Sequence, residues 1–164
     1  MRDRGGILIF LLMIIILIGG GFFVFKKALD SVPNEPLYGV KGVLEELQLA
    51  TTELDRGQRA LRYVDFVDRR LDELVKIENR GGTPKELLNA ALLFWEKEQK
   101  AIKELQRQPG IINFSEAKKK LLSVNQKAVV IFNRILDKTP EPEFYSILEI
   151  KNKIDDVTQE YSRN

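Results

Sequence analysis

The chain of 164 residues contains neither cysteine nor histidine. Without cysteine it can form no disulfide, no thiolate nucleophile, no thiolate metal site and no lipid-modified cysteine anchor. Without histidine it lacks the commonest metal ligand and the one side chain that normally titrates near neutral pH. The lack of cysteine is also compatible with an oxidising compartment. Any acid–base chemistry would therefore have to rest mainly on carboxylates.

An excess of charge of one sign is also missing, since 26 basic and 24 acidic residues leave a net charge of +2. Nucleic-acid binders usually gather a basic excess on one face. The sequence has no phosphate-binding glycine loop, no Gly-x-Ser-x-Gly and no Glu-x-x-His pair. Most carboxylates lie on mixed-charge helix faces. We therefore expect no enzyme activity, no cofactor, no metal and no nucleic-acid partner.

One long apolar run is present at residues 7–25, which contain no charged, polar or proline residue. As a helix this run would measure about 28 Å, close to the hydrocarbon thickness of about 30 Å in a bilayer. Backbone polar groups in lipid must be satisfied internally, so the run must be helical there. The sequence therefore predicts a single transmembrane helix at 7–25, with the lipid bilayer as its partner.

The flanks of this run bear on its orientation. Residues 1–6 form a short basic tail with Arg2 and Arg4, and Lys26 and Lys27 follow the run. The positive-inside count is nearly tied, and the free amino terminus favours an inside N-terminus. We expect a single-pass protein of the cell membrane with a cytoplasmic N-terminus and an extracytoplasmic C-terminal domain.

A cleaved signal peptide is the alternative, because glycines 19–21 could form a small-residue cleavage site near Gly21. The apolar run resumes at once with Phe22, Phe23, Val24 and Phe25, so cleavage would leave an apolar mature N-terminus. The length of the run and the lysines after it favour an uncleaved anchor.

Residues 26–35 are predicted to be a tether that contains Pro33, and residues 36–164 a helical domain. Proline suits the first position of a helix, so the first helix of the domain is expected to begin at Pro36. Its predicted apolar stripe consists of Leu37, Val40, Leu44, Leu47 and Leu54.

Four longer amphipathic segments follow, each with apolar residues at spacings of three and four. The first spans residues 56–79, and Gly81 or Gly82 can supply its left-handed closing residue. The second should begin at Pro84 with a capping box of Thr83 and Glu86, and stop at Pro109. The apolar positions of these two segments are Ala60, Val64, Val67, Leu71 and Leu74, then Leu88, Ala91, Trp95, Ile102 and Leu105, with Leu87 and Phe94 beside them.

The third segment is expected to begin at a capping box of Asn113 and Glu116, and the last after Thr139 and Pro140, where Thr139 can act as the cap. Their apolar positions are Phe114, Ala117, Leu121, Val124, Ala128, Ile131 and Ile135, then Phe144, Ile147, Ile154, Val157 and Tyr161. No segment alternates at period two. The predicted fold is all-α: one transmembrane helix, then an antiparallel bundle of four to five amphipathic helices joined as neighbours by short connections. Apolar surface left over on such stripes would suit a coiled-coil contact or self-association.

A motif lies at the start of this domain. The sequence reads Pro-Asn-Glu-Pro-Leu-Tyr over residues 33–38, then Lys41, then Glu45 with Gln48 and Leu49. It resembles a bacterial domain-of-unknown-function family with the pattern P-x-x-P-L-Y-x-x-K followed by E-x-x-Q-L, which lies just outside a membrane anchor or signal sequence. It departs from that pattern at Gly39, where the family often has a second proline. The resemblance implies a location and a helical fold, and it implies no activity.

The motif residues that we single out as an interaction or structural motif are Pro36, Leu37, Tyr38, Lys41, Glu45 and Gln48. Lys41, Glu45 and Gln48 share one helix face, so they could hydrogen-bond into a neighbouring helix. The favoured interpretation is that they fix the first helix to the bundle, and the alternative is a ligand site.

The sequence therefore predicts a non-enzymatic, membrane-anchored helical module that acts in binding, sensing or scaffolding, with an unidentified protein partner or self-association. Two alternatives stay open: a self-assembling component of a membrane complex, and a secreted helical domain after cleavage near Gly21.

Overall fold

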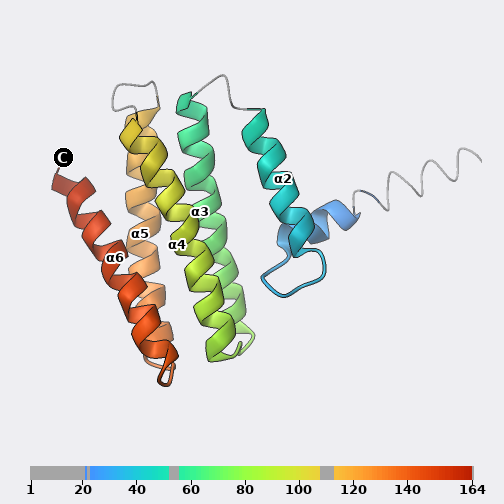
Figure 1. Ribbon diagram of the computed structural model, residues 1–164, viewed down its shortest axis with the longest axis vertical. Coiled ribbons are helices and arrows are strands. Elements are labelled where there is room, and N and C mark those ends of the chain that lie inside the picture. Colours follow the sequence, from blue (N-terminus) through green and yellow to red (C-terminus); the bar gives the residue numbers. More distant parts are fainter. Residues whose placement is uncertain (1–20, 22, 52–55, 108–112, 164) are drawn as a thin grey trace, which may run out of the picture. The chain divides into compact units, whose positions relative to one another are not determined.

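The computed structural model describes residue 21 and residues 23–51, 56–107 and 113–163. All secondary structure in these ranges is helical. The labelled helices are α2 (Tyr38–Ala50), α3 (Arg56–Asn79), α4 (Pro84–Arg107), α5 (Phe114–Leu136) and α6 (Glu143–Arg163) (Figure 1). The predicted all-α class is confirmed for this part of the chain. The chain divides into two compact units, residues 1–43 and residues 44–164.

The described part of the first unit contains a helical segment at residues 23–30, a non-helical connection at 31–37 and the first turns of α2. The predicted tether at 26–35 is thus helical over its first five residues. The connection is closed by local hydrogen bonds: Ser31 Oγ donates to the Ala28 carbonyl over 2.6 Å, and a Glu35 carboxylate oxygen accepts from the Val32 N–H over 3.0 Å. Lys41 Nζ donates to the Ser31 carbonyl over 3.2 Å.

The prediction that the first helix begins at Pro36 is wrong by two residues, because Pro36 and Leu37 belong to the turn and α2 begins at Tyr38. The Tyr38 N–H donates to the Glu35 carbonyl, which is a turn hydrogen bond three residues back. Asn34 adopts a left-handed φ of 74° just before this turn. A chain that reverses here cannot already be α-helical at Pro36.

In the second unit, α3 to α6 form a four-helix bundle whose successive members alternate in direction, as the colour gradient in Figure 1 shows. Around the bundle α3 contacts α4 and α5, and α6 contacts the same two helices. The remaining helix pair in contact, α4 with α5, meets across the diagonal of the bundle. The expectation that all consecutive helices are neighbours is therefore wrong for α4 and α5.

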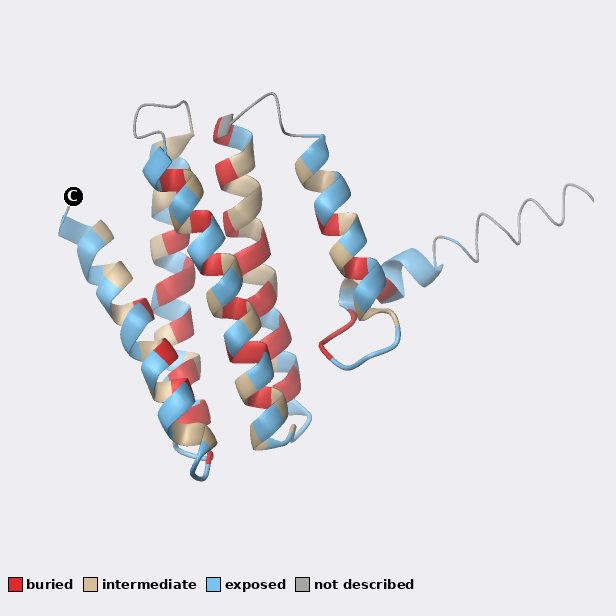
Figure 2. Ribbon diagram, viewed as in Figure 1, coloured by how far each residue is buried: buried red, intermediate tan, exposed pale blue. Residues whose placement is uncertain are grey.

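Buried residues run along the bundle helices as stripes (Figure 2). The largest fully buried side chains include Phe66 of α3, Phe94 of α4 and Phe132 of α5. The rings of Phe94 and Phe132 have centroids 5.9 Å apart, so they form part of the contact between α4 and α5. Interleaved large side chains of this kind supply the main favourable term in the free energy of folding.

The predicted stripes agree with this core in most positions. All five apolar positions predicted for α3 are buried, as are five of the seven predicted for α5, where Phe114 and Ile131 are half-buried. In α4 the buried face is rotated toward Leu87, Phe94 and Glu98, and it leaves Leu88, Trp95 and Ile102 half-buried. In α6 the predicted Ile147 and Ile154 are buried, together with Ile150, which was not predicted. The predicted positions Phe144, Val157 and Tyr161 are only half-buried.

The junction between α3 and α4 forms as the sequence predicts. Gly81 has a left-handed φ of 73° and donates to the Glu78 carbonyl, while the Gly82 N–H donates to the Ile77 carbonyl over 2.9 Å. This is the Schellman arrangement that glycine favours. A Cβ on Gly82 would lie 2.9 Å from the Ile77 carbonyl oxygen, so Gly82 is needed for its small size.

The capping box of α4 is confirmed, because the Thr83 N–H donates to Glu86 Oε2 over 2.9 Å and the Glu86 N–H donates to Thr83 Oγ1 over 3.3 Å. The hydrogen bond from the Thr83 N–H, together with one that Thr83 Oγ1 donates to Glu86 Oε2, lowers the pKa of the Glu86 carboxyl from its ordinary value. The two halves of the box satisfy two N–H groups that the helix leaves without intrahelical acceptors.

Two other predicted caps are wrong. Asn113 has a φ of 78° and its side chain makes no capping hydrogen bond, since a capping side chain requires an extended backbone at that residue. Thr139 closes the end of α5 by donating from Oγ1 to the Ile135 carbonyl over 2.8 Å, and α6 begins only at Glu143. The predicted stop at Pro109 lies outside the described residues.

An ion pair joins the C-terminal ends of α3 and α5. Both carboxylate oxygens of Glu78 accept from Arg134, one of them from Nε over 2.6 Å, and Lys138 Nζ lies 3.1 Å from Glu78 Oε1. The hydrogen bond from Arg134 is the largest cause that lowers the pKa of Glu78. Charge-assisted pairs with two parallel hydrogen bonds fix the relative position of the two helices.

The apolar stripe predicted for α2 is wrong. Val40 and Leu47 are 41% and 58% exposed, Leu37 and Leu44 are half-buried, and Leu54 lies outside the described residues. The buried positions of α2 are Lys41 and Glu45 instead. Charged side chains can take interior positions only when opposite charges or hydrogen bonds compensate for the lost water.

Among the helices that the structure describes, none is both long enough and apolar enough to cross a bilayer. The predicted transmembrane segment at 7–25 lies outside the described residues except for Gly21 and residues 23–25. Phe23, Val24 and Phe25 belong to the helical segment at 23–30, and all three are exposed.

Candidate functional site: a buried ion-pair cluster

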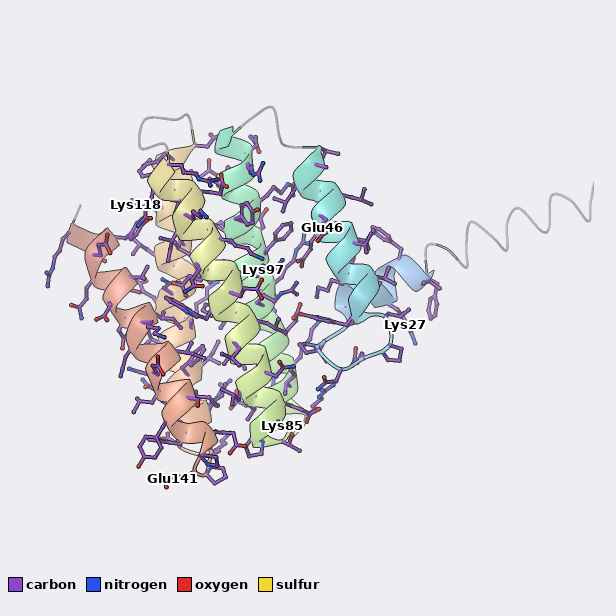
Figure 3. The ribbon with its side chains drawn as sticks, viewed as in Figure 1. Lys27, Glu46, Lys85, Lys97, Lys118 and Glu141 are labelled. Carbon is purple, nitrogen blue, oxygen red and sulfur yellow. The ribbon has the colours of Figure 1, made fainter. Side chains whose placement is uncertain are left out.

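Glu45 of α2 is 1% exposed, although it carries a charge. Its Oε2 atom lies 2.7 Å from Arg70 Nη2 of α3 and 2.9 Å from Lys97 Nζ of α4. Two cations from two different helices thus meet on one carboxylate oxygen. Figure 3 labels Lys97 on α4 and, on α2, Glu46, which is the exposed neighbour of Glu45.

Arg70 extends this arrangement to a second carboxylate. It is 4% exposed, and its other terminal nitrogen, Nη1, donates to Oε1 of Glu73 one turn further along α3. Glu73 is 1% exposed. We call Glu45, Arg70, Glu73 and Lys97 the buried ion-pair cluster. It contains two negative and two positive charges, so it is neutral as a unit.

An aromatic ring lies against this cluster. Phe66 of α3 is fully buried, and the cationic groups of Lys97 and Arg69 each lie 5.4 Å from the centre of its ring. Arg69 also donates from Nη1 to Gln48 Oε1 of α2 over 3.4 Å. The ring offers a negative π-face to both cations, which partly compensates for their loss of water. The polar contacts of α2 with α3 therefore run from Glu45 to Gln48.

The structure brings two of the six motif residues, Glu45 and Gln48, against α3. Lys41 is buried and bonds to Ser31 within the first unit. Pro36 is exposed in the turn, and Leu37 and Tyr38 are half-buried. The polar residues of the motif thus contact different elements: Lys41 contacts Ser31 within the first unit, and Glu45 and Gln48 contact α3 within the second.

Sequence reasoning missed the partners of Glu45. Arg70 and Glu73 each precede an apolar position of the α3 stripe, Leu71 and Leu74, so they lie at its edge, and three residues separate them along the helix. A basic and an acidic residue at that spacing on the border of a buried stripe are a readable signal for an intrahelical pair. The contact with Glu45, 25 residues earlier, has no local signal.

The chemistry of this cluster is mutual neutralisation. Desolvation of a single charge costs several kcal/mol, and the attraction between well-placed partners offsets it only when the geometry is good. Removing one member of such a buried set leaves the others uncompensated, which typically destabilises a protein by about 3–5 kcal/mol. Among the described residues, no group of carboxylates is arranged to hold a metal ion. The cluster therefore ties the second half of α2, through the Glu45 side chain, to α3 and α4.

Comparison with known proteins gives one finding. A family described as a domain of unknown function, DUF5667, matches residues 30–142. This range starts at the end of the helical segment at 23–30, includes α2 to α5 and stops just before α6. No curated protein and no solved structure matches the chain.

Proposed function

We propose that this chain, which belongs to the DUF5667 family of domains of unknown function, is a single-pass membrane protein that displays a helical module outside the cytoplasmic membrane. The module acts in binding, sensing or scaffolding, and it has no enzymatic activity. Its partner is a protein.

The apolar run at residues 7–25 is the observation that carries this proposal. It has the length and composition of a membrane-spanning helix, and lysines 26 and 27 follow where such a helix would leave the lipid. Phe23, Val24 and Phe25, at the end of the run, are exposed in a helical segment, as side chains that face lipid would be. The helical domain begins only a few residues later, so it would lie close to the membrane surface.

Within the module, we assign a structural role to the second half of the motif, E-x-x-Q-L. Glu45 and Gln48 both contact α3, and Glu45 also contacts α4. A ligand in their place would have to displace Arg70, Lys97 or Arg69. Packing of α2 therefore accounts for these residues better than a ligand site does.

Extraction of membranes with alkaline carbonate, followed by intact mass measurement, tests the anchor. A protein anchored by residues 7–25 stays in the membrane pellet with the mass of the uncleaved chain. Release of the uncleaved chain into the supernatant would contradict the anchor. A shortened, soluble form that begins near residue 22 would instead support the secreted alternative.

Self-assembly is a second candidate function, and the exposed apolar side chains of α2 favour it. Val40, Val43 and Leu47 are 41%, 57% and 58% exposed, and spacings of three and four place them on one side of the helix. Such a stripe is the kind of seam through which helices of two copies associate.

A single cysteine in this cysteine-free chain tests self-assembly. Leu47→Cys in native membranes should give a disulfide-linked dimer under mild oxidation if α2 contacts its copy. Glu46→Cys is the matched control, because Glu46 is also exposed but points about 100° away around the helix. No dimer from Leu47→Cys, or equal yields from both variants, would count against this candidate.

A further inference from the structure

A second buried polar pair lies between the diagonal helices α4 and α5. Glu98 and Asn125 are both fully buried, and Asn125 Nδ2 donates to Glu98 Oε1 over 2.7 Å. Among the described residues, no hydrogen bond joins Glu98 or Asn125 to the buried ion-pair cluster. We call Glu98 and Asn125 the acid–amide pair.

Each member of this pair has one oxygen without a hydrogen bond. Glu98 Oε2 and Asn125 Oδ1 are both buried, and neither has a donor in the part of the chain that the structure describes. Both atoms are acceptors when Glu98 is ionised, so they cannot bond to each other. A buried polar atom without a partner typically costs 1–3 kcal/mol, and more if it carries charge.

One proton removes this mismatch. A neutral Glu98 carboxyl has an O–H that can donate to Asn125 Oδ1, while Asn125 Nδ2 continues to donate to Glu98 Oε1. The result is a ring of two hydrogen bonds that uses every polar heavy atom of the acid and the amide. We propose that the acid–amide pair is a proton-binding site, in which protonation of Glu98 closes a second hydrogen bond between α4 and α5.

The surroundings favour the neutral acid. Along α4 the neighbours of Glu98 on the buried face are Phe94 and Ala101, and along α5 those of Asn125 are Leu121 and Ala128. An ionised carboxylate among apolar side chains loses its hydration without a replacement. Burial accordingly raises the pKa of Glu98 to about 7, against a smaller lowering by the hydrogen bond from Asn125.

Ion pairs on α4 and on the helices packed against it hold several of the charged groups around Glu98. Asp65 of α3 pairs with Lys120 of α5, and Lys151 of α6 lies 2.7 Å from Asp155. On α4 itself, Lys97, the neighbour of Glu98, pairs with Glu45. In the described structure the polar partner of Glu98 is Asn125. Among the described residues, the hydrogen bond from Asn125 is the one interaction that lowers the pKa of Glu98.

Through Glu98, the stability of the bundle should fall as the pH rises. An acidic residue in a salt bridge has the opposite effect, because its pKa is lowered and its contribution is lost as the pH falls. In the folded chain Glu98 binds a proton more tightly than in the unfolded chain, whose pKa is 4.5. The stabilisation is complete below about pH 4.5 and is lost as the pH rises toward 7. Between these limits the folding equilibrium constant should fall by about tenfold for each pH unit through this group.

The direct test measures the protonation of Glu98 itself. The full-length chain in non-ionic detergent, labelled with ¹³C at glutamate carboxyl carbons, is titrated by NMR, and the Glu98 signal is assigned by its loss in Glu98→Gln. The proposal expects the Glu98 carboxyl to titrate with a pKa near 7, well above the ordinary glutamate value of 4.5. A Glu98 carboxyl already ionised at pH 5 would overturn it.

Variants test the hydrogen-bond ring itself. Glu98→Gln carries a permanent N–H donor where the neutral acid has its O–H, so its denaturation midpoint should not decline between pH 5 and 7 through this site. Glu46→Gln removes the same charge from an exposed position and should keep the pH dependence of the unaltered chain. Identical pH profiles for Glu98→Gln and Glu46→Gln would refute the ring.

Discussion

Five charged or amide residues in the described part of the second unit are almost completely buried: Glu45, Arg70, Glu73, Glu98 and Asn125. Lys97, whose side chain is 19% exposed, joins the first three. They form two groups of different kinds: a neutral cluster of ion pairs, and an acid with an amide. The first group needs its charges, because each charge compensates for another. The second group is best satisfied when its acid has no charge.

The ion-pair cluster gives a prediction for a single substitution. Glu45→Gln keeps the size of the side chain but removes the charge that Arg70 and Lys97 share. We expect the free energy of unfolding to fall by about 3 kcal/mol, as when one partner of a buried ion pair is removed. Denaturant unfolding followed by circular dichroism measures this change.

Glu46→Gln is the control for Glu45→Gln as well, since it changes an exposed residue on the same helix. Its effect should stay within about 0.5 kcal/mol, as for most surface substitutions. If the two variants unfolded at the same denaturant concentration, the cluster would not hold α2 on the bundle.

At the scale of the helix, the sequence predicts those features well that depend on residues within one helical turn of each other. The bounds of α3, the glycine turn after it and the capping box of α4 all agree with the prediction. Apolar periodicity found most of the core of α3 and α5. These features depend on backbone geometry and on residues three or four positions apart, which a sequence displays directly.

Prediction failed where distant residues decide the outcome. The sequence predicts burial of Val40 and Leu47 of α2, which are exposed. The residues that contact the buried Glu45 lie 25 and 52 residues away along the chain, so no local pattern shows them. Glu98 occupies a core position, four residues after Phe94 and three before Ala101, and Asn125 lies four residues after Leu121. Their spacing was readable from the sequence, but their pairing across the bundle was not.

The capping box gives a prediction at this scale. Thr83→Ala removes the hydroxyl that accepts from the Glu86 N–H, so we expect the free energy of unfolding to fall by about 1 kcal/mol. Thr83→Ser keeps the hydroxyl and should unfold close to the unaltered chain. Equal unfolding midpoints for all three proteins would show that the start of α4 does not depend on this cap.

For the whole molecule, the family match and the fold do not have the same limits. The match ends at residue 142, whereas α6 begins at Glu143, contacts α4 and α5 and buries three isoleucines. The bundle therefore includes a fourth helix beyond the matched range. The unit boundary at residues 43 and 44 also lies inside α2, so the motif spans both compact units.

In the proposed function, the apolar segment at 7–25 anchors the helical bundle to the membrane. The proposal therefore depends on which side of the membrane the bundle occupies. Because the chain has no cysteine, one introduced thiol reports on a single place. Ser146→Cys puts a thiol on an exposed position of α6, and Asp3→Cys puts one in the basic tail.

Labelling of these two variants with a membrane-impermeant maleimide, in intact cells and after lysis, tests the proposal most directly. We predict that Ser146→Cys is labelled in intact cells, and that Asp3→Cys is labelled only after lysis. Labelling of Asp3→Cys alone in intact cells, or of neither variant before lysis, would contradict a helical module displayed outside the membrane.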